Sequence, residues 1–321
     1  MKVSGPRDLP DFRMWLIDQW KPAGIFAKSA VLMAAMGIDR VVDGVPVVNT
    51  DPNTETYALP RAALWWVTED MTDLVAHAAP TMPETTLTDD LIPDRFGLVV
   101  FAKPLMGVMA DTGEPISTDA MVWCRGVNLG REAINITSYH YSRAGEDIGN
   151  SRMGHVIADK DMWSPTGAAG WELGTDTETV DAPKLPSYDH RDESFSEDRR
   201  WLATLWLLAT QPLTDSTIER APRAAARRHD RAKLPASSDV RLINVRRRSA
   251  DKTDGNPDGS GREYSHRWIV GGEQGGFWRQ QAYGPAWSLR RPQWIDAYIA
   301  GPADKPLKIS ETVNVVKGET R

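Results

Sequence analysis

Arginine and tryptophan lie close together near the end of the chain, in HRWIVGGEQGGFWRQQAYGPAWSLRRPQWI, residues 266–295. A guanidinium group pairs with phosphate through two hydrogen bonds, and an indole ring stacks on an unpaired base. The presence of both groups on neighbouring strands predicts a surface that binds RNA or single-stranded DNA. The candidate binding residues are His266, Arg267, Trp268, Trp278, Arg279, Arg290, Arg291 and Trp294. The alternative is that these side chains stack on one another and only hold a small domain together.

Other residues that could support catalysis do not occur at spacings that define a reaction. The acidic groups Asp89, Asp90 and Asp94, and Glu193, Glu197 and Asp198, would suit a nuclease. Acids near loops and helix starts are, however, mostly solvated or capping groups. The sequence contains no GxxxxGK, GxSxG or HExxH pattern and no GxGxxG after a strand. We therefore predict no metal site and no cofactor, leave catalytic residues unknown, and leave enzyme activity open.

Three further side chains have both a chemical and a structural interpretation. Cys124, the single cysteine, lies in the strand-like run MVWCRGV and is expected to be a buried thiol rather than a nucleophile. His140 lies in an alternating segment and is expected to be half-buried in a sheet. His266, beside Arg and Trp, would contact a phosphate or a base edge, or serve as a structural donor.

The net charge of -6 is unevenly distributed along the chain. Residues 219–308 carry 18 Lys and Arg against 10 Asp and Glu, whereas the remainder carries 20 against 34. A basic region in an acidic protein predicts an anionic partner for that region, most often nucleic acid. The alternative is that the two regions neutralise each other across a domain interface.

Apolar periodicity predicts helices in the first half of the chain and around residue 200. Residues 11–37 should form two short helices, the first beginning near Asp11 and interrupted at Pro22. Residues 61–79 follow Pro60 and are predicted as a third helix. The run SEDRRWLATLWLLATQPL, 196–213, predicts a buried helix in which Trp201 and Trp206 pack in the core.

Short runs rich in β-branched and aromatic residues predict strands at 96–105, 120–127 and 133–142, forming an antiparallel sheet. Residues 143–193 resemble long connections. Further strands are expected in 240–248 and in the three segments that follow residue 262, with GGEQGG, 271–276, as a hairpin loop.

We therefore predict an α+β protein in which a mixed helix and antiparallel-sheet domain precedes a small, basic, β-rich C-terminal unit. The expected boundaries are a target-recognition domain over 1–218, a basic linker over 219–238 and an Arg/Trp-rich β unit over 239–321. The basic run within 221–239 is either a solvated segment or a short basic helix that touches phosphate. No apolar run of about 18 residues and no basic-then-apolar leader occur, so we expect no membrane association and a cytoplasmic location.

The C-terminal segments YSHRWIVGG, FWRQQAYGP and RRPQWIDAYIAGP resemble the end of an anti-CRISPR family found on phages and plasmids. The type V-A member of that family depletes the CRISPR effector nuclease by destroying its messenger RNA. The likeness extends in outline to WLATLWLLATQP and LIPDRFGLVVFAKP. Where the family has His before Trp, this chain has Phe277 before Trp278, so an acid–base mechanism with paired histidines would retain His266 alone.

The resemblance implies a bacteriophage or plasmid host-takeover factor that acts in the cytoplasm of a bacterial host. It would associate with RNA or the translation apparatus, and its acidic N-terminal domain would recognise a nascent or basic peptide, with the ribosome as a further partner. Two alternatives stay open: a nuclease acting on nucleic acid, and a protein-binding phage component with no nucleic-acid role. The last alternative would be favoured if the purified protein carries no bound nucleic acid and is insensitive to salt.

Overall fold

The computed structural model describes residues 1–27, 40–42, 45–47, 52–108, 115–128, 131–144, 161–175, 193–246, 266–271, 275–302 and 305–308. The chain divides into two compact units, Met1–Arg246 and Arg247–Arg321. Among the helices that the described ranges contain, none is long and apolar enough to cross a bilayer.

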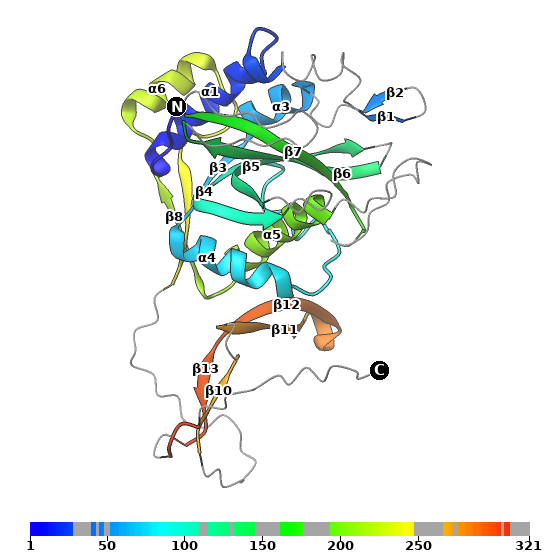
Figure 1. Ribbon diagram of the computed structural model, residues 1–321, viewed down its shortest axis with the longest axis vertical. Coiled ribbons are helices and arrows are strands. Elements are labelled where there is room, and N and C mark those ends of the chain that lie inside the picture. The colour runs from blue at the N-terminus through cyan, green and yellow to red at the C-terminus, as the bar shows by residue number, and fades with distance from the viewer. Residues whose placement is uncertain are drawn as a thin grey trace, which may run out of the picture. The chain divides into compact units, whose positions relative to one another are not determined.

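The first unit is built on a seven-stranded sheet in the order β7-β6-β5-β4-β3-β9-β8 (Figure 1). Its strands are β3 (Ala63–Val67), β4 (Phe96–Val108), β5 (Pro115–Asn128), β6 (Arg131–Ser142), β7 (Met162–Glu172), β8 (Thr214–Glu219) and β9 (Val240–Val245). β3 pairs in parallel with both β4 and β9, and the other pairings are antiparallel. The sheet is therefore mixed, with its two parallel pairings at the centre.

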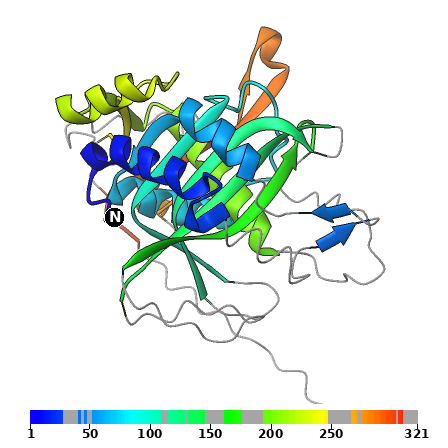
Figure 2. The same cartoon turned by 90° about the horizontal axis from the view of Figure 1, so that it is seen from above.

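Helices cover both faces of this sheet (Figure 1). One face carries α1 (Leu9–Trp20) and α3 (Pro52–Ala58), with α6 (Arg223–Ala232) packed beside α1, as Figure 2 shows from above. The opposite face carries α4 (Glu69–Ala78) and α5 (Glu193–Ala209). Short 3-10 turns occur at Pro6–Asp8, Leu59–Arg61 and Ala79–Thr81, and β1 (Arg40–Val42) pairs with β2 (Val45–Val47).

Each face of the sheet has its own apolar core. On the α1 face, the Trp20 indole donates a hydrogen bond to the Tyr139 hydroxyl at 2.9 Å within a cluster that includes Cys124. On the α5 face, the Trp123 ring lies 5.5 Å from that of Trp206 and 5.7 Å from that of Trp65. The predicted core positions of Trp206 and Trp201 and the burial of Cys124 are confirmed.

The α+β class is confirmed, and the strands predicted at 96–105, 120–127 and 133–142 form β4, β5 and β6 in antiparallel order. The helix predicted over 61–79 is wrong in its first part, because 63–67 is β3 and only 69–78 is helical. Residues 64–67 are buried on both faces between β4 and β9. A central strand buried on both faces has a continuous apolar run, which resembles a buried helix.

The boundary between the compact units also differs from the predicted one. The expected linker over 219–238 contains α6, and the predicted strand at 240–248 pairs with β3 inside the first unit. Of the two interpretations of the basic run, the structure has the short helix, whose buried side is formed by Ala225 and His229. The first unit therefore extends to Arg246.

Two other predictions are corrected in part. Within the connections predicted over 143–193, residues 162–172 form β7, an edge strand paired with β6. The first helix begins at Leu9 rather than at Asp11, and most of the second predicted helix lies outside the described residues. The Asp11 carboxylate accepts hydrogen bonds from Arg228 instead of capping the helix.

The second unit contains two ribbons of two antiparallel strands. β11 (Gly276–Tyr283) pairs with β12 (Leu289–Asp296), and they flank a 3-10 turn at Pro285–Trp287. β10 (Trp268–Val270) pairs with β13 (Tyr298–Ala300). Among the described strands β10 does not pair with β11, and residues 272–274 of the predicted hairpin loop lie outside the described residues.

Candidate nucleic-acid interface

The hairpin β11–β12 has two sides of different chemistry. Trp278 lies opposite Trp294, and Arg279 lies opposite Gln293. Because successive side chains of a strand point to opposite faces, the tryptophans share one side of the ribbon and Arg279 lies on the other. The Arg and Trp that the sequence places next to each other are thereby separated.

The tryptophan side is structural. Trp294 is 2% exposed, and its ring lies 5.4 Å from that of Trp278 in an edge-to-face arrangement. The Trp294 indole donates to an Asp296 carboxylate oxygen at 3.2 Å. Gly276 is needed beneath it, because a Cβ there would overlap the Trp294 ring. Trp294 is therefore a packing residue and does not present its face to a base.

The opposite side has a basic and polar group of five residues: Arg279, Gln281 and Tyr283 from β11 and Arg291 and Gln293 from β12, by the alternation of the strands. The same side also carries the apolar residues Phe277, Leu289 and Ile295. Both arginines on this side are exposed. Arg279 donates to the Gln281 side-chain oxygen at 2.6 Å, and the Arg291 guanidinium lies 5.5 Å from the centre of the Tyr283 ring. We call this group of five residues the arginine side of the hairpin.

The tip of the hairpin adds a residue that the sequence analysis did not select. Trp287 is 68% exposed and follows Ala286, and both residues have positive φ angles of 58° and 52°. Arg290, exposed beside it, donates to the Trp287 carbonyl at 3.3 Å. Four tryptophans lie within 266–295, and only the strand pairing shows that Trp287 is the one at an exposed turn.

The remaining predicted residues belong to the other ribbon. The His266 ring lies 6.1 Å from that of Trp268, which begins β10. Arg267 donates from Nε to the Lys305 carbonyl at 2.8 Å, and its backbone bridges to Leu307. Arg267 therefore holds two chain segments together, and the structure does not place this trio on the arginine side of the hairpin.

In the first unit, Ser117, Asp119 and His140 form a polar cluster between β5 and β6. His140 Nδ1 lies 3.0 Å from an Asp119 carboxylate oxygen, which also accepts the Tyr141 backbone N–H at 2.9 Å. Ser117 Oγ contacts that same Nδ1. In a Ser-His-Asp triad the serine and the carboxylate bind opposite ring nitrogens, so this cluster lacks that geometry. It ties two strands together, in agreement with the expected half-buried sheet position of His140.

The acidic residues proposed for a nuclease have separate surroundings. Asp94 accepts the Trp65 indole N–H at 2.9 Å, and Asp89 pairs with Arg125 at 2.6 Å. Asp198 is buried on α5 and accepts the Ser138 hydroxyl at 2.6 Å. Within the described part of the chain, no group of three or more His, Cys, Asp or Glu is arranged to hold a metal ion.

No protein-family model matches the chain, and no curated protein is similar to it. A function must therefore be argued mainly from the geometry of the hairpin β11–β12.

Proposed function

We propose that the protein binds single-stranded nucleic acid, RNA in particular, through the arginine side of the hairpin β11–β12 and its tip. The observation that carries the proposal is the exposure of Arg279, Arg291 and Trp287 on one short hairpin. Guanidinium groups contact phosphates, and an exposed indole accepts a stacked base without sequence preference. Trp294 and Trp278 hold the hairpin in this shape from its other side.

The first prediction concerns the charge on the hairpin. Arg279→Ala combined with Arg291→Ala should weaken binding of a labelled 20-nucleotide RNA and reduce the slope of log K against log salt by roughly 1.4, since each single-strand phosphate contact contributes about 0.7. Lys2→Ala with Lys21→Ala removes two exposed charges from the first unit and serves as the matched control. An unchanged slope in the hairpin variant would contradict the proposal.

The second prediction concerns the tip. Trp287→Ala should weaken RNA binding about 5- to 150-fold, because a base stacked on an aromatic ring contributes about 1–3 kcal/mol. The salt slope should stay constant, since no cation is removed. Equal affinity of this variant and the parent protein would show that the tip does not contact bases.

We further propose that this binding serves regulation, in the manner of the anti-CRISPR family that the C-terminal motifs resemble. The protein would lower expression of a target in the cytoplasm of a bacterial host, with a nascent or basic peptide and the ribosome as partners of the acidic first unit. Transcript levels in bacteria that produce the parent protein or the Arg279→Ala/Arg291→Ala variant test this. Identical transcript profiles would reject it.

A further inference from the structure

A second basic surface lies on the first unit, along α6. Arg223, Arg227 and Arg231 follow one another at four-residue intervals and are all exposed. Four residues of an α-helix rise about 6 Å and return to nearly the same side. We call these three residues the α6 arginine row. The exposed Arg220 and Lys233 extend its charge at either end.

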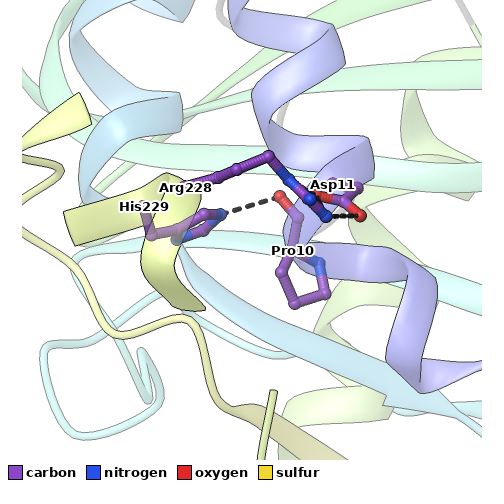
Figure 3. A network of polar contacts seen from close by, with 4 residues as sticks. All are labelled: Pro10, Asp11, Arg228 and His229. Atoms are coloured by element: carbon purple, nitrogen blue, oxygen red, sulfur yellow. Dashed lines mark hydrogen bonds and ion pairs between the residues drawn. The ribbon is translucent and has the colours of Figure 1, made fainter. Parts of the chain in front are cut away.

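The opposite side of α6 attaches the helix to α1. Ala225 and His229 are buried, and they lie about 200° around the helix from Arg227. His229 Nε2 lies 2.8 Å from the Pro10 carbonyl, and Arg228 donates to both carboxylate oxygens of Asp11 beside it (Figure 3). Docking thus uses Arg228 and His229 and leaves the arginine row facing solvent.

The protonation of His229 is fixed by its second contact. Its Nδ1 lies 2.6 Å from the Arg13 guanidinium, which can only donate, so Nδ1 accepts and Nε2–H donates to Pro10. Burial lowers the pKa of His229, and burial also lowers the pKa of Arg13 to about 10. His229, on the inner side of α6, is therefore a neutral imidazole that donates a hydrogen bond to α1.

Among the described residues, the arginine row has no ion-pair partner. In the described structure, no carboxylate forms an ion pair with Arg223 or Arg227, and Arg231 donates only to the Arg227 carbonyl. Like charges four residues apart destabilise a helix, and Arg223 at the first position faces the positive end of the helix dipole. An external anion would relieve both effects.

The charge around the row contrasts with the rest of the first unit. Residues 219–246 carry 8 Lys and Arg against 3 Asp and Glu, whereas residues 1–218 carry 18 against 32. An anionic polymer would be repelled by most of this unit and attracted to α6. The charge asymmetry along the chain thus includes a local basic surface on the acidic unit itself.

We infer that the α6 arginine row binds the phosphate backbone of nucleic acid, independently of the hairpin in the second unit. The outward side carries the three arginines, Ala224 and the exposed Asp230, with no large apolar residue. It therefore lacks the aromatic anchors of a protein interface and the apolar face of a membrane-surface helix, and it stays net positive. Arginine without base-reading partners matches phosphate contact, which is independent of sequence.

The experiment uses the full chain carrying Arg279→Ala and Arg291→Ala, to which Arg223→Ala and Arg227→Ala are added. Binding is measured across a salt series with a 20-nucleotide RNA and a 20-base-pair DNA duplex. The added changes should lower the salt slope by roughly 1.4 for the RNA and 1.8 for the duplex. Arg223→Lys with Arg227→Lys should retain most of the slope, because it keeps the charge.

Controls separate this inference from the hairpin proposal. Lys2→Ala with Lys21→Ala, in the same hairpin-variant background, should leave both slopes unchanged, and circular dichroism should show equal helix content in all proteins. If the added α6 changes weaken nucleic-acid binding, this inference is supported even where the hairpin changes have no effect. Unchanged slopes would overturn it. The inference would also be overturned if the α6 changes abolished binding to polyglutamate or to anionic vesicles but left nucleic-acid binding intact. That result would identify another partner.

Discussion

At the scale of single residues, Asp198 has the most altered chemistry. It lies buried on α5 with its carboxylate accepting the Ser138 hydroxyl at 2.6 Å. The pKa of Asp198 is raised to about 7, mainly by burial and also by the nearby Glu197, while the Ser138 hydrogen bond acts in the opposite direction. Because β6 and α5 meet at this contact, protonation of one carboxyl affects how the helix packs on the sheet.

This burial predicts a pH-dependent stability. The folded-state pKa lies above the value of about 3.9 in an unfolded chain, so the contribution of Asp198 is greatest below pH 4 and is lost as pH rises to about 7. Asp198→Asn keeps an acceptor for Ser138 but does not titrate. Relative to the parent protein, the variant should gain up to about 4 kcal/mol of unfolding free energy between pH 4 and pH 8.

Denaturant unfolding of both proteins at pH 4, 6 and 8 measures this difference. His229, whose lowered pKa acts with the opposite sign, is common to both proteins and cancels. A difference that does not vary with pH would show that Asp198 ionises without cost in the folded state.

Individual residues also show what the sequence can predict about the site. Arg279, Arg290 and Arg291 were selected from composition and are exposed as expected. Trp294 was selected on the same grounds but is buried, whereas Trp287 was not selected and is exposed. Exposure of an indole depends on which strand lies opposite it, and pairing between distant segments is not encoded in local spacing.

At the scale of elements, the docking of α6 depends on one histidine. The His229 ring accepts a hydrogen bond from Arg13 and donates one to the Pro10 carbonyl. Removal of the ring leaves the buried Arg13 guanidinium without this hydrogen-bond acceptor. His229→Ala should destabilise the protein by about 1–3 kcal/mol, and the α6 amides should exchange with deuterium faster than those of α5. Arg227→Ala, on the outward side, is the matched control. Equal exchange of α6 in the two variants would contradict the docking role.

Elements also differ in how well the sequence predicts them. β4 and β5 were identified from short β-branched and aromatic runs between turn residues, and β6 from its alternation. β3 was missed because its five-residue apolar run is followed after one residue by the true helix α4, so the two were read as one helix. α6 was predicted only as one alternative for a basic segment, since its buried side is Ala225 and His229 rather than large apolar residues.

At the scale of the whole molecule, the two units differ in what stabilises them. Both apolar cores of the first unit are closed by elements within residues 1–246. Among the described residues of the second unit, Trp294 alone is a buried hydrophobic side chain. Two-stranded ribbons with so little buried surface are marginally stable in isolation.

A chain shortened to residues 1–246 should therefore retain a cooperative thermal transition, whereas residues 247–321 alone should show none. Differential scanning calorimetry of the two fragments measures this. A fragment 1–218, which ends at the domain boundary expected from the sequence, lacks β9 and should not fold cooperatively. A cooperative transition in 1–218 would show that β9 is dispensable for the sheet.

The parallel pairing of β3 with β9 also affects the order in which the protein can be made and folded. Thr68 after β3 donates to Asn244 of β9, 176 positions later. At synthesis rates of about 5–20 residues per second, roughly 9–35 s pass between the synthesis of β3 and that of this neighbour. During that interval one edge of a highly apolar strand is unpaired, so the growing chain depends on early covering by α1 and α4 or on a chaperone. The basic helix and the hairpin are synthesised after most of the acidic residues of the first unit.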